Sequence, residues 1–126
     1  MTATVQVLGG HIQLFSRTAL SEVQWRLLSG NNRETGRGAD AYPDAESCRI
    51  GVKTLQAAID DLDGSVRRVG SNEWGWRLML DGRLVASSQR GFDRMIRCEQ
   101  GLAQFLVQLR DAHIGSSVMV SEARRW

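Results

Sequence analysis

The stretch that decides the fold is residues 74–88, WGWRLMLDGRLVASS. Every second residue of 74–80 is a large apolar one, which is the period of a strand with one buried face. Asp81-Gly82 follows, and because glycine accepts the positive φ of a tight turn, this pair predicts a two-residue hairpin. Residues 84–88 then return as the partner strand. The stretch therefore predicts a β-hairpin with one apolar face.

The same pattern occurs a second time, about 50 residues earlier in the chain. Gln24-Trp25-Arg26-Leu27 matches Gly75-Trp76-Arg77-Leu78 at an offset of 51, and Tyr42, Cys48 and Gly51 match Phe92, Cys98 and Gly101 at an offset of 50. The one-residue difference falls in a turn, where an insertion disturbs little buried backbone. The recurrence predicts one domain made of two repeats, residues 11–63 and residues 64–121 with a closing strand. Residues 1–10 are expected to be an extension with a possible strand, and residues 122–126 a tail.

Each predicted hairpin is followed by a predicted helix. Apolar residues step by three and four along one helical stripe in each copy, at Ala45, Cys48, Val52, Leu55, Ile59 and Leu62 and at Met95, Cys98, Leu102, Phe105, Leu109 and Ala112. Asp44 and Asp93 stand where N-caps belong. Both cysteines lie on the stripes and are expected to pack as small hydrophobes.

The remaining predicted strands complete an α+β fold. They are residues 11–15, 23–27, 34–39, 65–69 and 116–120, and Gly36 and Gly38 are expected to weaken the third of these. We predict two tandem β-β-β-α(-β) repeats that share one antiparallel sheet with two helices packed on it. The pattern leaves open whether the tryptophan face or the arginine face of the sheet meets the helices.

Composition and motifs exclude several classes of function. The 126 residues are 42% hydrophobic and 24% charged, as in an ordinary soluble domain, and a cytoplasmic protein without a signal peptide or a membrane span is expected. His11 and His113 stand alone, and Cys48 and Cys98 lack metal-ligand spacing. Ser87-Ser88 does not lie on a nucleophile elbow. We therefore predict no catalytic residue, no metal site and no cofactor, and a protein that is not an enzyme.

Charge points weakly toward a binding surface. The formal net charge is only +2, but residues 11–63 carry six basic and eight acidic groups, whereas residues 64–113 carry eight basic and five acidic groups. Lys53 is the only lysine among the sixteen cations. Arginine favours planar partners such as carboxylates and phosphates.

If the tryptophans face the helices, the opposite surface displays the candidate partner-binding residues Arg26, Arg67, Arg68, Arg77, Leu28 and Met79. Such a surface suits another protein, a second copy of the chain in a homodimer, or RNA. A simpler interpretation is that these arginines cover apolar surface and pair with Glu34 or Glu73. Our first hypothesis is a non-enzymatic module for protein interaction or dimerisation, and the alternative is weak RNA binding through the arginines.

The second copy resembles the YegP-like family, which consists of small proteins of unknown function. The resemblance is carried by Trp74-x-Trp-Arg-Leu, the Asp81-Gly82 turn, residues 85–88, Phe92 and the helix that contains Gly101. The first copy departs from the pattern at Gly36-Arg37-Gly38. The resemblance implies two units that share one sheet and exchange their C-terminal strands, and it implies no activity. Since the segment of residues 64–69 is short, we expect it to serve as the first strand of the second unit.

Overall fold

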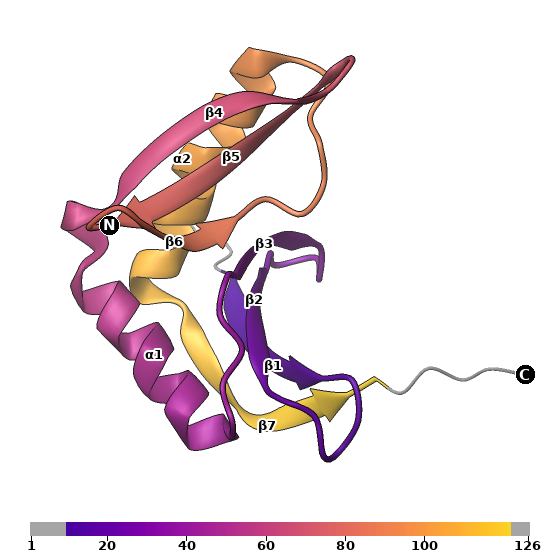
Figure 1. Ribbon diagram of the computed structural model, residues 1–126, viewed down its shortest axis with the longest axis vertical. Coiled ribbons are helices and arrows are strands. Elements are labelled where there is room, and N and C mark those ends of the chain that lie inside the picture. Colours follow the sequence, from indigo (N-terminus) through magenta and orange to yellow (C-terminus); the bar gives the residue numbers. More distant parts are fainter. Residues whose placement is uncertain (1–9, 122–126) are drawn as a thin grey trace, which may run out of the picture.

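The structure, a computed structural model, describes residues 10–121. The strand that the sequence allows within residues 1–10 and the tail 122–126 therefore lie outside the described residues, Gly10 excepted. The elements are β1 (His11–Ser16), β2 (Gln24–Leu28), β3 (Glu34–Gly38), α1 (Ala45–Ala57), the 3-10 turn η1 (Ile59–Asp61), β4 (Asp63–Gly70), β5 (Glu73–Leu80), β6 (Arg83–Ser87), α2 (Met95–Asp111) and β7 (His113–Val120) (Figure 1).

The strands form one seven-stranded sheet in the order β4-β5-β6-β3-β2-β1-β7. The predicted α+β class, with one sheet and two helices, is confirmed. The prediction of an antiparallel sheet is wrong at one pair, because β7 runs parallel to β1, with His113 beside His11. The strand directions account for this: β1 and β7 both run opposite to β6, the strand that precedes α2, so the two meet in the parallel direction at the edge of the sheet.

The two halves of the chain meet in the middle of the sheet, where β3 pairs with β6 through Arg37 and Ser87. Each half contributes three antiparallel strands and then a helix. β4 follows η1 and pairs with β5, so the strand expected at residues 65–69 is present. β7 leaves the second half and becomes the outer neighbour of β1 in the first (Figure 1).

The tryptophan face of the sheet meets the helices. Trp25 is 2% exposed and Trp76 is 1% exposed, and both rings contact Phe105 of α2, at centroid distances of 6.4 and 4.5 Å. Cys48 and Cys98 are buried in the same cluster, as predicted. Burial raises the pKa of the Cys48 thiol to about 11, and it raises that of Cys98 too. Both thiols are therefore protonated packing groups at neutral pH.

The glycines of β3 have a steric role that the sequence pattern does not reveal. A Cβ atom on Gly36 would lie 2.6 Å from Cη2 of Trp76 and 2.7 Å from Cε1 of Phe105, and a Cβ on Gly38 would overlap the ring of Trp25. These glycines leave the room that three buried aromatic rings occupy.

One of the two predicted helix caps is wrong. The amide of Ser47 donates to Oδ1 of Asp44 at 2.8 Å, so Asp44 caps α1 as expected. In α2 the N-cap is Arg94, whose side chain makes no capping bond. The amide of Cys98 donates to the carbonyl oxygen of Arg94, which sets the start of the helix one residue beyond Asp93.

Candidate partner-binding surface

The sheet face opposite the helices, here called the open face, carries one row of polar side chains across six strands. The strand register aligns Ser65, Arg77, Ser87, Arg37, Arg26 and Gln13, on β4, β5, β6, β3, β2 and β1 respectively. Neighbouring members are paired residues, and paired residues project on the same side of a sheet. We call these six residues the arginine row.

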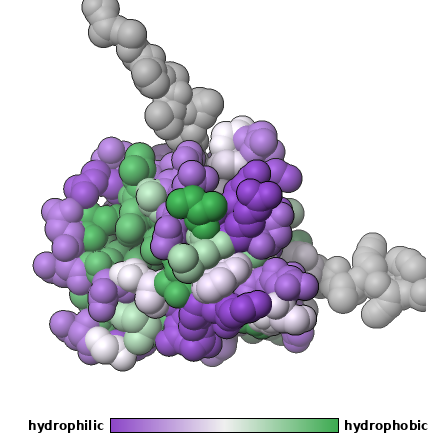
Figure 2. Space-filling model, turned by 90° about the horizontal axis from the view of Figure 1, so that it is seen from above, coloured by the Kyte–Doolittle hydropathy of each residue, from purple (hydrophilic) through white to green (hydrophobic). Residues whose placement is uncertain are grey.

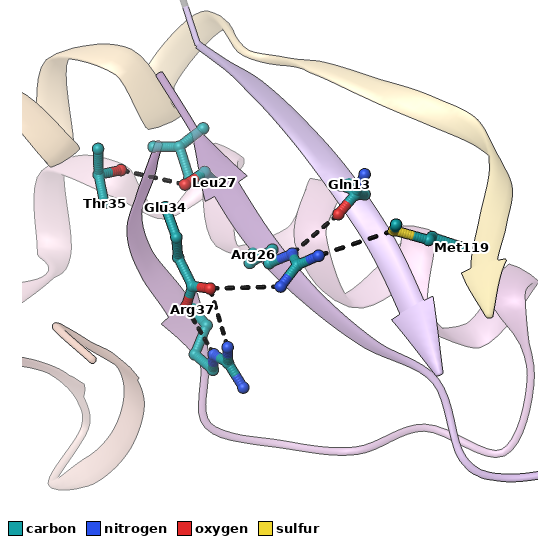
Figure 3. A network of polar contacts seen from close by, with 7 residues as sticks. All are labelled: Gln13, Arg26, Leu27, Glu34, Thr35, Arg37 and Met119. Carbon is teal, nitrogen blue, oxygen red and sulfur yellow. Dashed lines mark hydrogen bonds and ion pairs between the residues drawn. The ribbon is translucent and has the colours of Figure 1, made fainter. Parts of the chain in front are cut away.

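In the first half, the carboxylate of Glu34 balances the positive charge of the arginine row. Its carboxylate accepts from Arg37 through Nε and Nη2 at 2.7 and 2.8 Å and from Nη1 of Arg26 at 3.4 Å, while Nε of Arg26 donates to Gln13 at 2.8 Å (Figure 3). Both guanidinium groups also lie over the ring of Phe15, 4.6 and 4.9 Å from its centroid. The simpler interpretation, in which arginines pair with Glu34, is thus the arrangement seen for Arg26.

In the second half, the row contains an unbalanced cation, Arg77. Its Nη2 lies 4.0 Å from the sulfur of Met79, and its Nε is buried without a hydrogen-bond partner among the described residues. Its row neighbours Ser65 and Ser87 are uncharged. A buried guanidinium nitrogen without a partner is costly, because it has given up water and gained nothing in return.

The candidate residues from the sequence fall into two sets. Arg26, Arg77 and Met79 lie on the open face, and Arg67 lies on the same side of β4 as Ser65. Arg68, one residue further on, projects to the other side, where its guanidinium sits 5.5 Å from the Trp74 ring and donates to the carbonyl of Ser71.

The apolar part of the open face differs from the part that the sequence suggested. Leu28 is only 8% exposed and offers little surface. Val69 and Met119 are 52% and 46% exposed, and Met119, paired with Phe15, contacts Nη2 of Arg26 through its sulfur (Figure 3). Sequence patterns did not indicate Met119 and Arg37 as surface candidates, because their neighbours on β1 and β6 become known only with the sheet order. The open face therefore combines arginine, methionine and phenylalanine.

No group of His, Cys, Asp or Glu within residues 10–121 gathers as metal ligands would. No helix in this part of the chain is long and apolar enough to cross a membrane.

Comparisons with known proteins identify the fold. No family model and no curated protein sequence matches the chain. The solution NMR structure of YegP from E. coli, a protein of unknown function, matches with a TM-score of 0.69 and 13% identity over 90% of this chain and 97% of that one. A UPF0339 protein from Shewanella oneidensis matches with a TM-score of 0.70 and 11% identity over 87% and 92% of the two chains. The resemblance to the YegP-like family is thus confirmed at the level of the fold, and the chain is built as these proteins are.

Proposed function

We propose that the chain is a non-enzymatic binding module, built from two structural repeats, that docks an acidic surface of another protein on its open face. The observation that carries this proposal is Arg77, a partly buried cation on β5, the second strand from one edge of the sheet. Among the described residues its Nε has no hydrogen-bond partner and its guanidinium group forms no ion pair. A carboxylate from a partner would supply the missing charge at this guanidinium group, whose Nε itself is buried.

Equivalent contacts in the two halves support the repeat. Arg37 pairs with Ser87, the residue 50 positions later, as expected if an approximate two-fold axis passes between them. Isolated bridges join Val23 to Tyr42 in one half and Trp74 to Phe92 in the other. A Cβ on Gly51 would strike the Tyr42 ring, and a Cβ on Gly101 would strike the Phe92 ring.

The repeat also explains why Arg77 lacks a partner. Arg26 and Arg77 are equivalent, and Glu34, which balances Arg26 in the first half, corresponds to Leu84 in the second. The second half has thus kept the arginine without the acid. A partner's carboxylate paired with the Arg77 guanidinium group would take the place that Glu34 has beside Arg26.

The composition of the open face favours an acidic protein over the other two candidates. Arginine, methionine and aromatic residues are enriched in protein interfaces. A second copy bound through the same face would bring arginine rows together, which like-charge repulsion disfavours. RNA bases stack on aromatic rings or guanidinium planes, and here the ring of Phe15 and the guanidinium groups of Arg26 and Arg37 already lie against one another.

The test begins with a photo-crosslinking amino acid at Ser87, which lies beside Arg77 on the open face. We expect a specific protein adduct in the protein's own cells that survives nuclease treatment. The same probe at Lys53, an exposed residue of α1, is the control and should give no such adduct.

The crosslinked protein is then purified, and its affinity for the chain is measured. Arg77→Met should weaken binding by about 10- to 100-fold, because hydrogen bonds to charged groups are worth about 1.5–3 kcal/mol. Arg110→Met, which removes an exposed arginine on α2, should leave the affinity unchanged. An adduct that disappears with nuclease, or equal effects of both substitutions, would contradict the proposal.

Self-association is the second candidate, and the edge strand β4 favours it. All of its eight residues except Val66 are exposed, and among the described residues it pairs with β5 alone. An unpaired edge of this length can pair with the same edge of a second copy. Sedimentation over a range of concentrations tests it, and a strict monomer at the highest concentration would rule it out.

A further inference from the structure

A cleft of about 550 Å³ opens where the second half of the chain approaches β3. Its walls are the β2–β3 turn, the segment before α2 and the first turns of that helix, and the cations among its lining residues are Arg33, Arg90 and Arg97. It lies toward the end of the molecule at which α2 begins, where hydrophilic and hydrophobic surface alternate (Figure 2). The volume is that of a site for a small organic ligand.

The equivalent place in the first half is closed. There the amide of Ala39 donates to the carbonyl of Val85 at 3.0 Å, and Arg83 forms an ion pair with Asp40 at 2.7 Å. The corresponding bond in the second half, from Gln89 to Thr35, is not made among the described residues. The two strand segments therefore separate, and the cleft occupies the opening.

At one position the two places carry residues of opposite charge. Residue by residue at an offset of 50, Arg83 corresponds to Arg33, but Asp40 corresponds to Arg90, and Ser47 corresponds to Arg97. Two arginines thus meet where the first half has an arginine and an aspartate, and a third replaces a serine.

The arginines of the cleft are not neutralised by the protein. None of the ion pairs among residues 10–121 includes Arg33, Arg90 or Arg97, and their side chains donate no hydrogen bond to a described residue. Two carboxylates reach the lining, those of Glu34 and Asp93. The Glu34 carboxylate already pairs with Arg26 and Arg37 of the open face. The three guanidinium groups of the cleft therefore have one free carboxylate near them, that of Asp93.

We propose that this cleft binds the phosphate monoester group of a small organic molecule. The planar guanidinium group matches phosphate oxygens in a bidentate fashion, and three of them suit a dianion better than a single carboxylate. The cleft is larger than one phosphate group requires, and Phe92, Gly101 and Gln104 line the room left for the organic part. The proposal uses the correspondence between the two halves but not the protein partner of the open face, so each can fail without the other.

The test is an NMR titration of the whole isotope-labelled chain at constant ionic strength, with inorganic phosphate, AMP and adenosine as probes. We expect AMP to produce saturable shifts in the amides of Gly91, Arg97, Gly101 and Thr35, with inorganic phosphate weaker at the same amides and adenosine without effect. Inorganic phosphate binding as tightly as AMP would show an anion site without an organic subsite. Binding of adenosine, or a single-stranded RNA oligonucleotide binding more tightly than AMP at these amides, would overturn the proposal.

Arg90→Asp installs the acid that the first half has at Asp40, and we expect it to reduce the AMP affinity about tenfold or more. The double variant Arg33→Gln/Arg97→Gln should do the same without creating a new ion pair. Lys53→Glu makes the same change in net charge on the exposed face of α1 and should leave the affinity unchanged. Equal losses in Arg90→Asp and Lys53→Glu would mean that only the overall charge matters, and the site would be refuted.

Discussion

Adding one methyl group to β3 should measurably destabilise the protein. The change is Gly36→Ala, which places a Cβ atom 2.6 Å from Cη2 of Trp76 and 2.7 Å from Cε1 of Phe105. Both atoms belong to rigid rings that are 1% and 0% exposed, so neither ring can turn out into solvent. To restore ordinary contacts of about 3.5–4 Å, the rings must move by roughly 1 Å within a packed core.

Two opposing terms set the magnitude. Inserting volume into a well-packed core costs about 1–3 kcal/mol. Replacing glycine by alanine restricts the unfolded chain and gives back about 0.4–1 kcal/mol. The net expectation for Gly36→Ala is a loss of about 1–2 kcal/mol in the free energy of unfolding. For a domain of this size, that loss lowers the Tm by roughly 4–8 °C.

Urea denaturation followed by tryptophan fluorescence measures the change. The matched control is Gly70→Ala, since a Cβ there would meet only Glu73, at 3.8 Å, and this variant should be unchanged or slightly more stable. Phe105→Leu should cost less in the Gly36→Ala background than in the wild type, because it removes one of the two ring contacts that the new Cβ makes. An unchanged or raised stability of Gly36→Ala would refute the steric role of this glycine.

Two further predictions concern titrating groups. Burial raises the pKa of the Cys48 and Cys98 thiols and keeps them protonated. Neither thiol should therefore react with a chromogenic disulfide reagent in the native state, and both should react in denaturant. Rapid labelling of the native protein would contradict the burial. The hydrogen bond from the Ser47 amide lowers the pKa of Asp44 below its ordinary 3.8, so its stabilisation is present above that value and is lost as the pH falls through the folded pKa. Asp44→Ala should therefore be less stable than the wild type at neutral pH, and this difference in stability should vanish in acid. The free energy of unfolding of both proteins, measured between about pH 2 and pH 6, checks the prediction. A difference that stays constant with pH would contradict the capping role.

The local elements were predictable because short-range rules determine them. Asp81 and Gly82 adopt φ values of 53° and 80°, the positive values that the hairpin turn requires. The apolar stripe of the second helix follows α2 to within one residue of its end. The stripe of the first helix predicted a helix to Leu62, but α1 ends at Ala57, and a 3-10 turn keeps Ile59 buried at nearly the same spacing.

The long-range arrangement was not predictable from periodicity. The parallel pairing of β7 with β1 joins residues about a hundred positions apart, and alternation along a strand says nothing about its neighbour. The arginines of the cleft come from the β2–β3 turn, a loop and α2, and only the pairing of β3 with β6 brings these segments together. A signal was nevertheless available: aligning the two copies residue by residue shows Arg90 where Asp40 stands, and Arg97 where Ser47 stands.

The pairing of β7 with β1 also determines when the sheet is completed during synthesis. During synthesis the first three strands leave the ribosome early, but the strand that covers the outer edge of β1 is nearly the last part of the described chain to emerge. Until then β1 presents unpaired backbone groups together with Ile12 and Leu14, the features of an aggregation-prone edge. A nascent chain that stops before His113 would therefore be a natural client for chaperones, whereas the finished chain, with β7 in place, would not.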